Sequence, residues 1–215
     1  MSDVPPDPDL SAPRKLVCLE TYWGDHSERL FQNTSVRPFL EALGSQLYPP
    51  LRVAHRFVES GAQLAGYAAR PDGLLWRDQD VFDAPVFYLS FHGSPGALRS
   101  GPERVEAAAL CRAFEGWGEK YANLIYFGAC SVFAGRAGQR FARDFLAASG
   151  CRAILGYATD MDWMDSMVTD LLFLRRFFRD SEPWRNIRPI HRSVLGDFAA
   201  ARRLKFQLHE AREPA

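Results

Sequence analysis

Two apolar runs, each leading into a chemically reactive side chain, place the strongest constraint on the fold of this 215-residue chain. Residues 86–91 lead directly into His92, and residues 124–127 lead through two small residues into Cys130. Short runs dense in branched and aromatic residues are typical of strands buried on both faces, as in a parallel sheet. Adjacent parallel strands end at the same sheet edge, so the imidazole and the thiol can meet there.

Strand-like runs alternate with helical periods along the chain. We expect strands at Lys15–Thr21, Leu51–Phe57, Pro85–Phe91, Leu124–Phe127 and Arg152–Tyr157. Apolar residues at helical spacing predict helices over Val36–Leu47, Glu103–Trp117, Arg136–Ser149, Met164–Phe178 and Ser193–Leu208. The alternation predicts an α/β fold: a three-layer α/β/α sandwich with a mostly parallel central sheet. Residues 61–84 break this rhythm and receive no assignment.

Length and composition favour one domain. The chain is 47% apolar, which is enough for a sizeable core at this length. The first 14 residues contain four prolines and little that could be buried, which predicts a disordered leader over residues 1–14. Residues 15–215 then form a single domain that ends in a C-terminal helix.

Charge and cysteine spacing exclude several classes of function. Lys plus Arg and Asp plus Glu both total 26, so no net field favours nucleic acid or an anionic membrane. No apolar stretch approaches the length of a membrane span, and the acidic N-terminus is unlike a signal peptide, so we expect a cytoplasmic protein. The cysteines show neither C-x-x-C pairs nor metal-ligand spacing, so we expect no metal, no cofactor and no disulfide.

Most of the remaining cysteines and histidines have simpler explanations. Cys18, Cys111 and Cys151 fall inside predicted elements, where packing accounts for them. The same reading, as surface or packing residues, applies to His26, His55, His191 and His209.

His92 and Cys130 together suggest nucleophilic catalysis. A free thiol is mostly protonated at pH 7, and it becomes a competent nucleophile when an imidazole takes its proton. The backbone N–H groups of Gly93 and Cys130 could hold the oxyanion of an acyl-transfer intermediate. A single cysteine at a strand end is more often an inert buried residue. The occurrence of both groups at the ends of two strong strands favours the functional interpretation.

Three segments resemble a known family. Ser90-Phe91-His92-Gly93, Gly128-Ala129-Cys130-Ser131 and the stretch from Gly150 to Tyr157 followed by Asp160 to Asp165 look like the caspase-fold cysteine peptidases of clan CD. The likeness is nearest to their bacterial CHAT type. It implies a caspase-like domain, a dyad of Cys130 as nucleophile and His92 as general base and acid, and no metal or cofactor. The N–H groups of Gly93 and Cys130 would hold the oxyanion.

The resemblance also implies a substrate pocket whose charge opposes that of the residue before the scissile bond. The acidic candidates here are Asp25, Asp160, Asp162 and Asp165. They point to a weak preference for a basic target residue, although acidic residues in a first helical turn also stabilise the helix. Bacterial relatives often cut a dedicated protein partner in defence or signalling pathways, so we expect a protein or peptide substrate and an activating partner or ligand.

Two other functions fit the same residues. The chain could be a non-catalytic caspase-fold binding or scaffold module, in which case removal of the thiol would leave its role intact. It could also be a thiol amidase acting on small molecules, which a narrow closed cleft would favour over an open groove.

Overall fold

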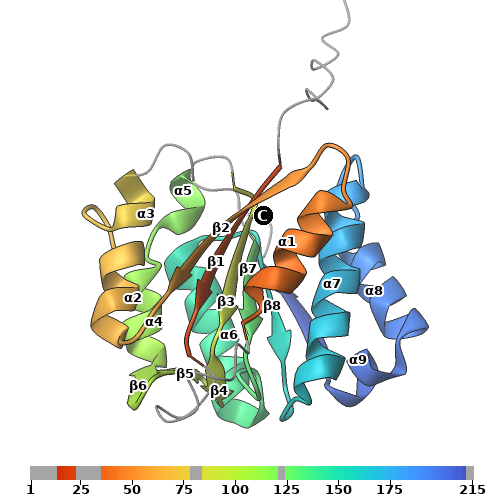
Figure 1. Ribbon diagram of the computed structural model, residues 1–215. Helices are drawn as coiled ribbons and strands as arrows, with labels where there is room; N and C mark the ends of the chain where they lie inside the picture. The colour runs from red at the N-terminus through yellow and green to blue at the C-terminus, as the bar shows by residue number, and fades with distance from the viewer. Residues whose placement is uncertain (1–13, 23–34, 78–83, 121–123, 212–215) are drawn as a thin grey trace, which may run out of the picture.

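A six-stranded sheet forms the middle layer of the computed structural model, which describes residues 14–22, 35–77, 84–120 and 124–211 (Figure 1). Its strands are, in spatial order, β2 (Leu51–Phe57), β1 (Arg14–Glu20), β3 (Val86–Ser90), β7 (Leu124–Gly128), β8 (Ala153–Tyr157) and β9 (Phe206–Glu210). The first five are mutually parallel, and β9 pairs antiparallel with β8.

Helices cover both faces of the sheet. One face carries α1 (Arg37–Ser45), α7 (Trp163–Arg179), α8 (Ile187–Asp197) and α9 (Ala199–Arg203) (Figure 1). The other carries α2 (Gly61–Ala68), α3 (Leu74–Arg77), α4 (Ala107–Ala113), α5 (Trp117–Lys120) and α6 (Gly135–Ser149). The predicted three-layer α/β/α sandwich with a mostly parallel central sheet is therefore confirmed. None of the helices in the described ranges is both long and apolar enough to cross a bilayer.

The alternation of side chains along each strand divides the core into two layers. On the α6 face, Phe127 lies 5.5 Å from Phe141 and 5.2 Å from Phe145, measured between ring centroids. On the α7 face, the neighbouring Tyr126 contacts Phe173 edge-on at 5.9 Å. Burial of each such ring contributes about 2 to 3 kcal/mol, which explains why these strands have no polar face.

A buried carboxylate fastens α7 to the sheet. Tyr88, Tyr126 and Tyr157 rise from three adjacent strands, and each hydroxyl donates to the carboxylate of Asp170 on α7. Burial raises the pKa of Asp170 to about 6, while the three phenol donors oppose that shift. The three hydroxyl donors offset the free-energy cost of burying a carboxylate in an otherwise apolar layer.

The predicted helix over Glu103–Trp117 is wrong in its first and last turns. Residues Glu103–Glu106 form β6, which pairs antiparallel with β5 (Ala97–Ser100), and β5 pairs with β4 (His92–Ser94). In β6 only Val105 is buried and its neighbours are exposed, which is the alternation of a half-buried strand. The helix begins later, as α4, and is interrupted by a turn before α5.

The predicted C-terminal helix over Ser193–Leu208 is also only partly present. Its first part is helical in α8 and α9, but Lys205 adopts φ +48° and Phe206 begins β9. A left-handed residue ends a helix, and pairing with β8 then outweighs the local helical period. Residues 61–77 hold α2 and α3. The predicted leader and domain limits stay predictions, since residues 1–13 and 212–215 lie outside the described part.

Candidate active site at the carboxyl edge of the sheet

The register of two parallel strands brings His92 and Cys130 level with each other. β3 pairs with β7 from Val86 opposite Leu124 to Ser90 opposite Gly128, a constant offset of 38 positions. The same offset separates His92 from Cys130. The pairing extends beyond the ladder, because the Phe91 N–H donates to the Gly128 carbonyl at 3.3 Å. The two candidate residues therefore leave neighbouring strands at the same height.

Gly93 brings the backbone after His92 against the peptide that carries the cysteine. A Cβ at Gly93 would lie 2.2 Å from the Cys130 carbonyl oxygen and 3.0 Å from its nitrogen. These distances are too short for any residue with a side chain, so glycine is required for this approach. His92 is exposed at the start of β4 and Cys130 is half-buried at the end of β7, so solvent and ligands reach both.

The backbone register pairs His92 with a basic residue. His92 of β4 stands directly opposite Arg99 of β5, which is exposed. Residues directly opposite each other in an antiparallel pair share a face of the sheet. The local field at His92 therefore includes the charge of Arg99, a neighbour that the sequence pattern did not identify.

Backbone hydrogen bonds hold the segment after the cysteine against the end of β8. The Ser131 N–H donates to the Thr159 carbonyl at 2.9 Å, and the Phe133 N–H donates to the Tyr157 carbonyl at 3.0 Å. Ser131 adopts φ +51°, a left-handed conformation that costs a non-glycine residue about 1 kcal/mol or more. This turn diverts the chain immediately after Cys130 and leaves its thiol at the sheet edge.

The surroundings of Cys130 keep its thiol protonated at neutral pH. Partial burial is the largest cause of its raised pKa, and the charge of Asp160 raises the pKa further. The backbone N–H groups of Met161 and of Cys130 itself oppose the rise. Attack by this sulfur therefore requires proton transfer to a base.

The acidic pocket candidates have different positions. Asp160 follows β8 and accepts a hydrogen bond from the Ser131 hydroxyl at 2.7 Å, next to the cysteine. Asp162 caps α7 by accepting from the Asp165 N–H at 3.0 Å, and Asp165 pairs with Arg203 at 3.0 Å. Both thus have structural partners, and their role in a pocket stays a prediction. Asp25 and His26 lie outside the described residues.

A buried polar cluster around one carboxylate lies beside the site and was not predicted from the sequence. Glu20, fully buried at the end of β1, lies 2.6 Å from His55 Nε2 and accepts from the Ser35 hydroxyl at 2.7 Å and the Val36 N–H at 2.9 Å. Glu20 stands opposite Ser90, two residues before His92. This cluster anchors the start of α1 next to the candidate site, and the one available signal was an acidic residue closing an apolar run.

The remaining thiols are also free, and Cys111 is as accessible as Cys130. Cys18 and Cys151 are buried and Cys111 is half-buried. Burial raises the pKa of the Cys151 thiol to about 12. The described residues contain no group of three or more His, Cys, Asp or Glu side chains placed to hold a metal ion.

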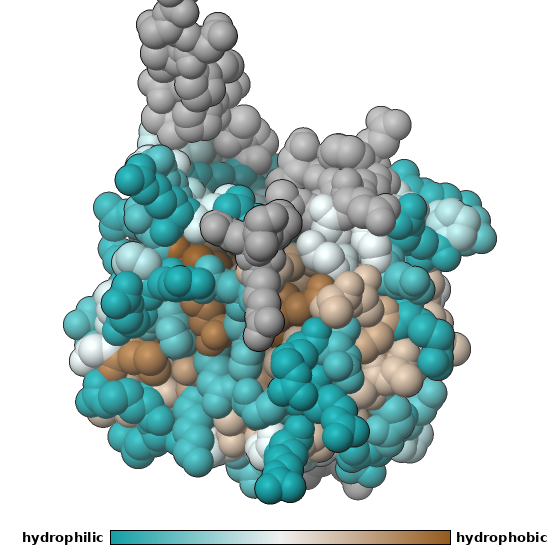
Figure 2. Space-filling model, turned by 180° about the vertical axis from the view of Figure 1, so that it is seen from behind, coloured by the Kyte–Doolittle hydropathy of each residue, from teal (hydrophilic) through white to brown (hydrophobic). Residues whose placement is uncertain are grey.

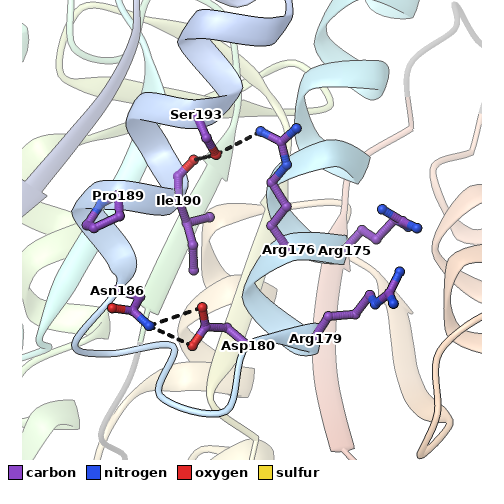
Figure 3. A pocket seen from close by; sticks show the side chains of 8 residues that line it. All are labelled: Arg175, Arg176, Arg179, Asp180, Asn186, Pro189, Ile190 and Ser193. Atoms are coloured by element: carbon purple, nitrogen blue, oxygen red, sulfur yellow. Dashed lines mark hydrogen bonds between the residues drawn. The ribbon is translucent and has the colours of Figure 1, made fainter.

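Neither His92 nor Cys130 lines either of two open cavities. One, of about 540 Å³, lies between α7 and α8 and is shown in Figure 3. Its arginines Arg175 and Arg179 are near the end of α7, whereas the candidate site is near the beginning of that helix. The other, of about 560 Å³, lies between α6 and β9, nearer the cysteine. In Figure 2, hydrophilic side chains predominate at the lower end of the molecule, where the parallel strands end.

Comparisons with known proteins give a likeness to solved structures only. No family model matches the sequence, and no curated protein matches it. A solved structure similar to this fold is that of a secreted C11 cysteine protease from Bacteroides thetaiotaomicron in complex with an irreversible peptide inhibitor. The two share 12% sequence identity over 86% of this chain and 59% of that one, with a TM-score of 0.47. This chain thus spans less than two thirds of that protein, and so distant a likeness assigns no activity to it.

Proposed function

We propose that this chain is a cysteine peptidase in which Cys130 is the nucleophile and His92 is the general base and acid. The observation that carries the proposal is that β3 and β7 pair with the same offset in sequence that separates His92 from Cys130. The close approach of Gly93 to the Cys130 peptide adds to it. An exposed imidazole and a half-exposed thiol at one sheet edge have the residue types and order that nucleophilic acyl transfer needs.

The proposed reaction has two halves. The Cys130 sulfur forms a bond to the peptide carbonyl carbon while its proton passes to the His92 imidazole. The tetrahedral intermediate then breaks its C–N bond, and the imidazolium gives the proton to the leaving amine. In the second half, His92 takes a proton from water as the water oxygen bonds to the thioester carbonyl carbon. The C–S bond then breaks, the imidazolium returns the proton to the Cys130 sulfur, and the carboxylic acid is released.

Backbone donors support the charged intermediate in this proposal. The N–H groups of Cys130 and Met161 already face the sulfur, since both lower its pKa. The donor expected from sequence alongside Cys130 was Gly93, whose backbone lies within contact of the same peptide. Two such donors in a partly buried site typically contribute several kcal/mol to oxyanion stabilisation.

The raised pKa of Cys130 makes reaction of its sulfur depend on His92 as the base, and we expect an activating partner or ligand to increase that reactivity further. The proposed enzyme has a caspase fold near the CHAT type and is cytoplasmic. It would cut a dedicated protein partner in a bacterial defence or signalling pathway. Asp160 supports a weak preference for a basic residue before the scissile bond, because it is exposed and adjacent to the cysteine segment.

A non-catalytic binding module is the second candidate. The observation that favours it is the raised pKa of Cys130, since a protonated thiol is a poor nucleophile. The two candidate functions differ in whether the protein needs the Cys130 sulfur to act.

Digestion of a peptide library, read by mass spectrometry, tests the proposal. The wild-type chain should cleave a subset of peptides, the Cys130→Ala variant should cleave none, and the control Cys111→Ala should cleave as the wild type does. Cleavage that persists in Cys130→Ala would contradict the proposal. Absence of cleavage by the wild type, with and without cell extract as a source of activator, would favour the binding module.

A further inference from the structure

The cavity between α6 and β9 is lined by cations. Arg136, Arg140 and Arg143 recur on one side of α6, and Lys205 enters from the turn before β9. All four side chains are exposed, and none has an ion pair or hydrogen bond with any described residue. No carboxylate from the described ranges lines the cavity. Four cations thus share one concave surface on a chain whose net charge is zero.

Two glutamines provide a fixed polar wall. The Gln139 amide donates to the Phe133 carbonyl at 2.9 Å and to Gln207 Oε1 at 3.0 Å. His209 Nε2 lies 3.1 Å from the same oxygen. With its oxygen held in this way, Gln207 has a defined orientation, and its Nε2 donors are not used by the described residues. The wall therefore offers donors to an acceptor in the cavity.

This arrangement favours an anion with more than one charged group. Like charges in a concave site repel one another and focus a positive potential that an anion relieves. Guanidinium groups match phosphate oxygens in bidentate geometry. Arg136 and Arg143 are seven residues apart on the helix, which is about 10 Å along its axis, so the cations are spread over a length that two or more linked phosphates would span.

The cavity in Figure 3 makes a useful contrast. It also presents arginines, but Asp180 lies on its wall and is bound by the Asn186 amide at 3.0 Å. Arg176 there donates to the Ser193 hydroxyl at 2.8 Å and to Asp197 at 2.6 Å. Its charges are therefore partly satisfied within the protein, whereas no described residue pairs with those of the α6–β9 cavity.

We propose that the cavity between α6 and β9 binds a small anion carrying at least two linked phosphate groups. Arg136, Arg140, Arg143 and Lys205 would pair with the phosphates, and Gln207 would donate to a phosphate oxygen. A nucleoside triphosphate and free inorganic polyphosphate share this chemistry. The inference concerns binding only, and it does not depend on the proposed peptidase activity.

Titration calorimetry of the full chain with inorganic tripolyphosphate, at fixed ionic strength, tests the proposal. The double variant Arg136→Gln/Arg140→Gln should bind at least about tenfold more weakly, because charged hydrogen bonds are lost. The matched control is Arg192→Gln, which removes an exposed arginine of α8 that lines neither cavity. It should bind as the wild type does.

Each outcome of the titration either supports or overturns the proposal. Equal binding of tripolyphosphate and a nucleoside triphosphate would identify the phosphates as the recognised group, and tighter nucleotide binding would identify a nucleotide as the source. Absence of binding, or an equal loss in the Arg192→Gln control, would overturn the proposal. Tighter binding of a polyglutamate peptide through the same arginines would also overturn it, because the site would then recognise acidic peptides. Thermal unfolding of each variant checks that it is folded.

Discussion

Substitution of Gly93 by alanine tests how the site is built. The added Cβ would lie 2.2 Å from the Cys130 carbonyl oxygen and 2.9 Å from the Ala129 Cβ, whereas ordinary contacts begin at 3.4 Å. Since the nearest atom belongs to the backbone, no rotamer change relieves the overlap. The two strand ends must separate by about 1 Å, and a misplacement of that size commonly costs about 100-fold in rate.

The same overlap has a cost in stability. Insertion of a methyl group into a closely packed contact typically destabilises a protein by about 1 to 3 kcal/mol. Gly66 provides the control, because a Cβ there would have no neighbour within 4 Å and the residue is in α2. Gly66→Ala should be neutral or stabilising by up to about 1 kcal/mol, since alanine favours helix.

Two measurements follow the consequences of Gly93→Ala. Iodoacetamide labelling at pH 7, read at Cys130 by mass spectrometry, should slow at least to the rate of a His92→Ala variant. Urea unfolding should show the loss of about 1 to 3 kcal/mol. If Gly93→Ala labels at the wild-type rate and unfolds within about 0.5 kcal/mol of the wild type, the contact does not position the dyad.

Three further predictions concern buried or charged groups. The pKa of Asp170 is raised to about 6 from its ordinary 3.8, so the folded chain binds the extra proton. The unfolding free energy should therefore fall by on the order of 3 kcal/mol as the pH rises from about 4 to 6. Asp170→Asn should abolish that dependence in urea titrations. Glu20→Gln should lower the unfolding free energy by about 3 kcal/mol, against less than about 1 for the exposed Glu41→Gln. Asp160→Asn should shift the pH midpoint of Cys130 labelling downward, because Asp160 raises that pKa. An unchanged midpoint would show that its charge does not reach the sulfur.

The sequence predicted the sheet well because the strand signal is local. The runs that became β1, β3, β7 and β8 are short and mostly apolar, β2 carries polar residues among its apolar ones, and the alternation of these runs with helical periods predicts parallel pairing. β9 could not be predicted, because Leu208 and its neighbours have no strong strand pattern. They become a strand by pairing with β8, a contact distant in the sequence.

The candidate site was predictable in its residues but not in its surroundings. His92 and Cys130 each follow a run that predicts a strand, so their position at one sheet edge could be predicted, and the β3–β7 register agrees with it. The N–H of Met161 could not be found, since any residue supplies a backbone N–H and only the turn after β8 directs this one. Glu20 and His55 are 35 positions apart and meet only because β1 and β2 pair.

The pH dependence of alkylation at each cysteine, compared between the wild type and His92→Ala, tests the central claim most directly. Cys111 is the internal reference for a half-buried thiol, and Cys151 for a buried one. The account predicts that Cys130 labels fastest near neutral pH and loses this advantage in His92→Ala, while Cys111 is unaffected. Identical labelling of Cys130 in the two proteins would contradict the proposed dyad.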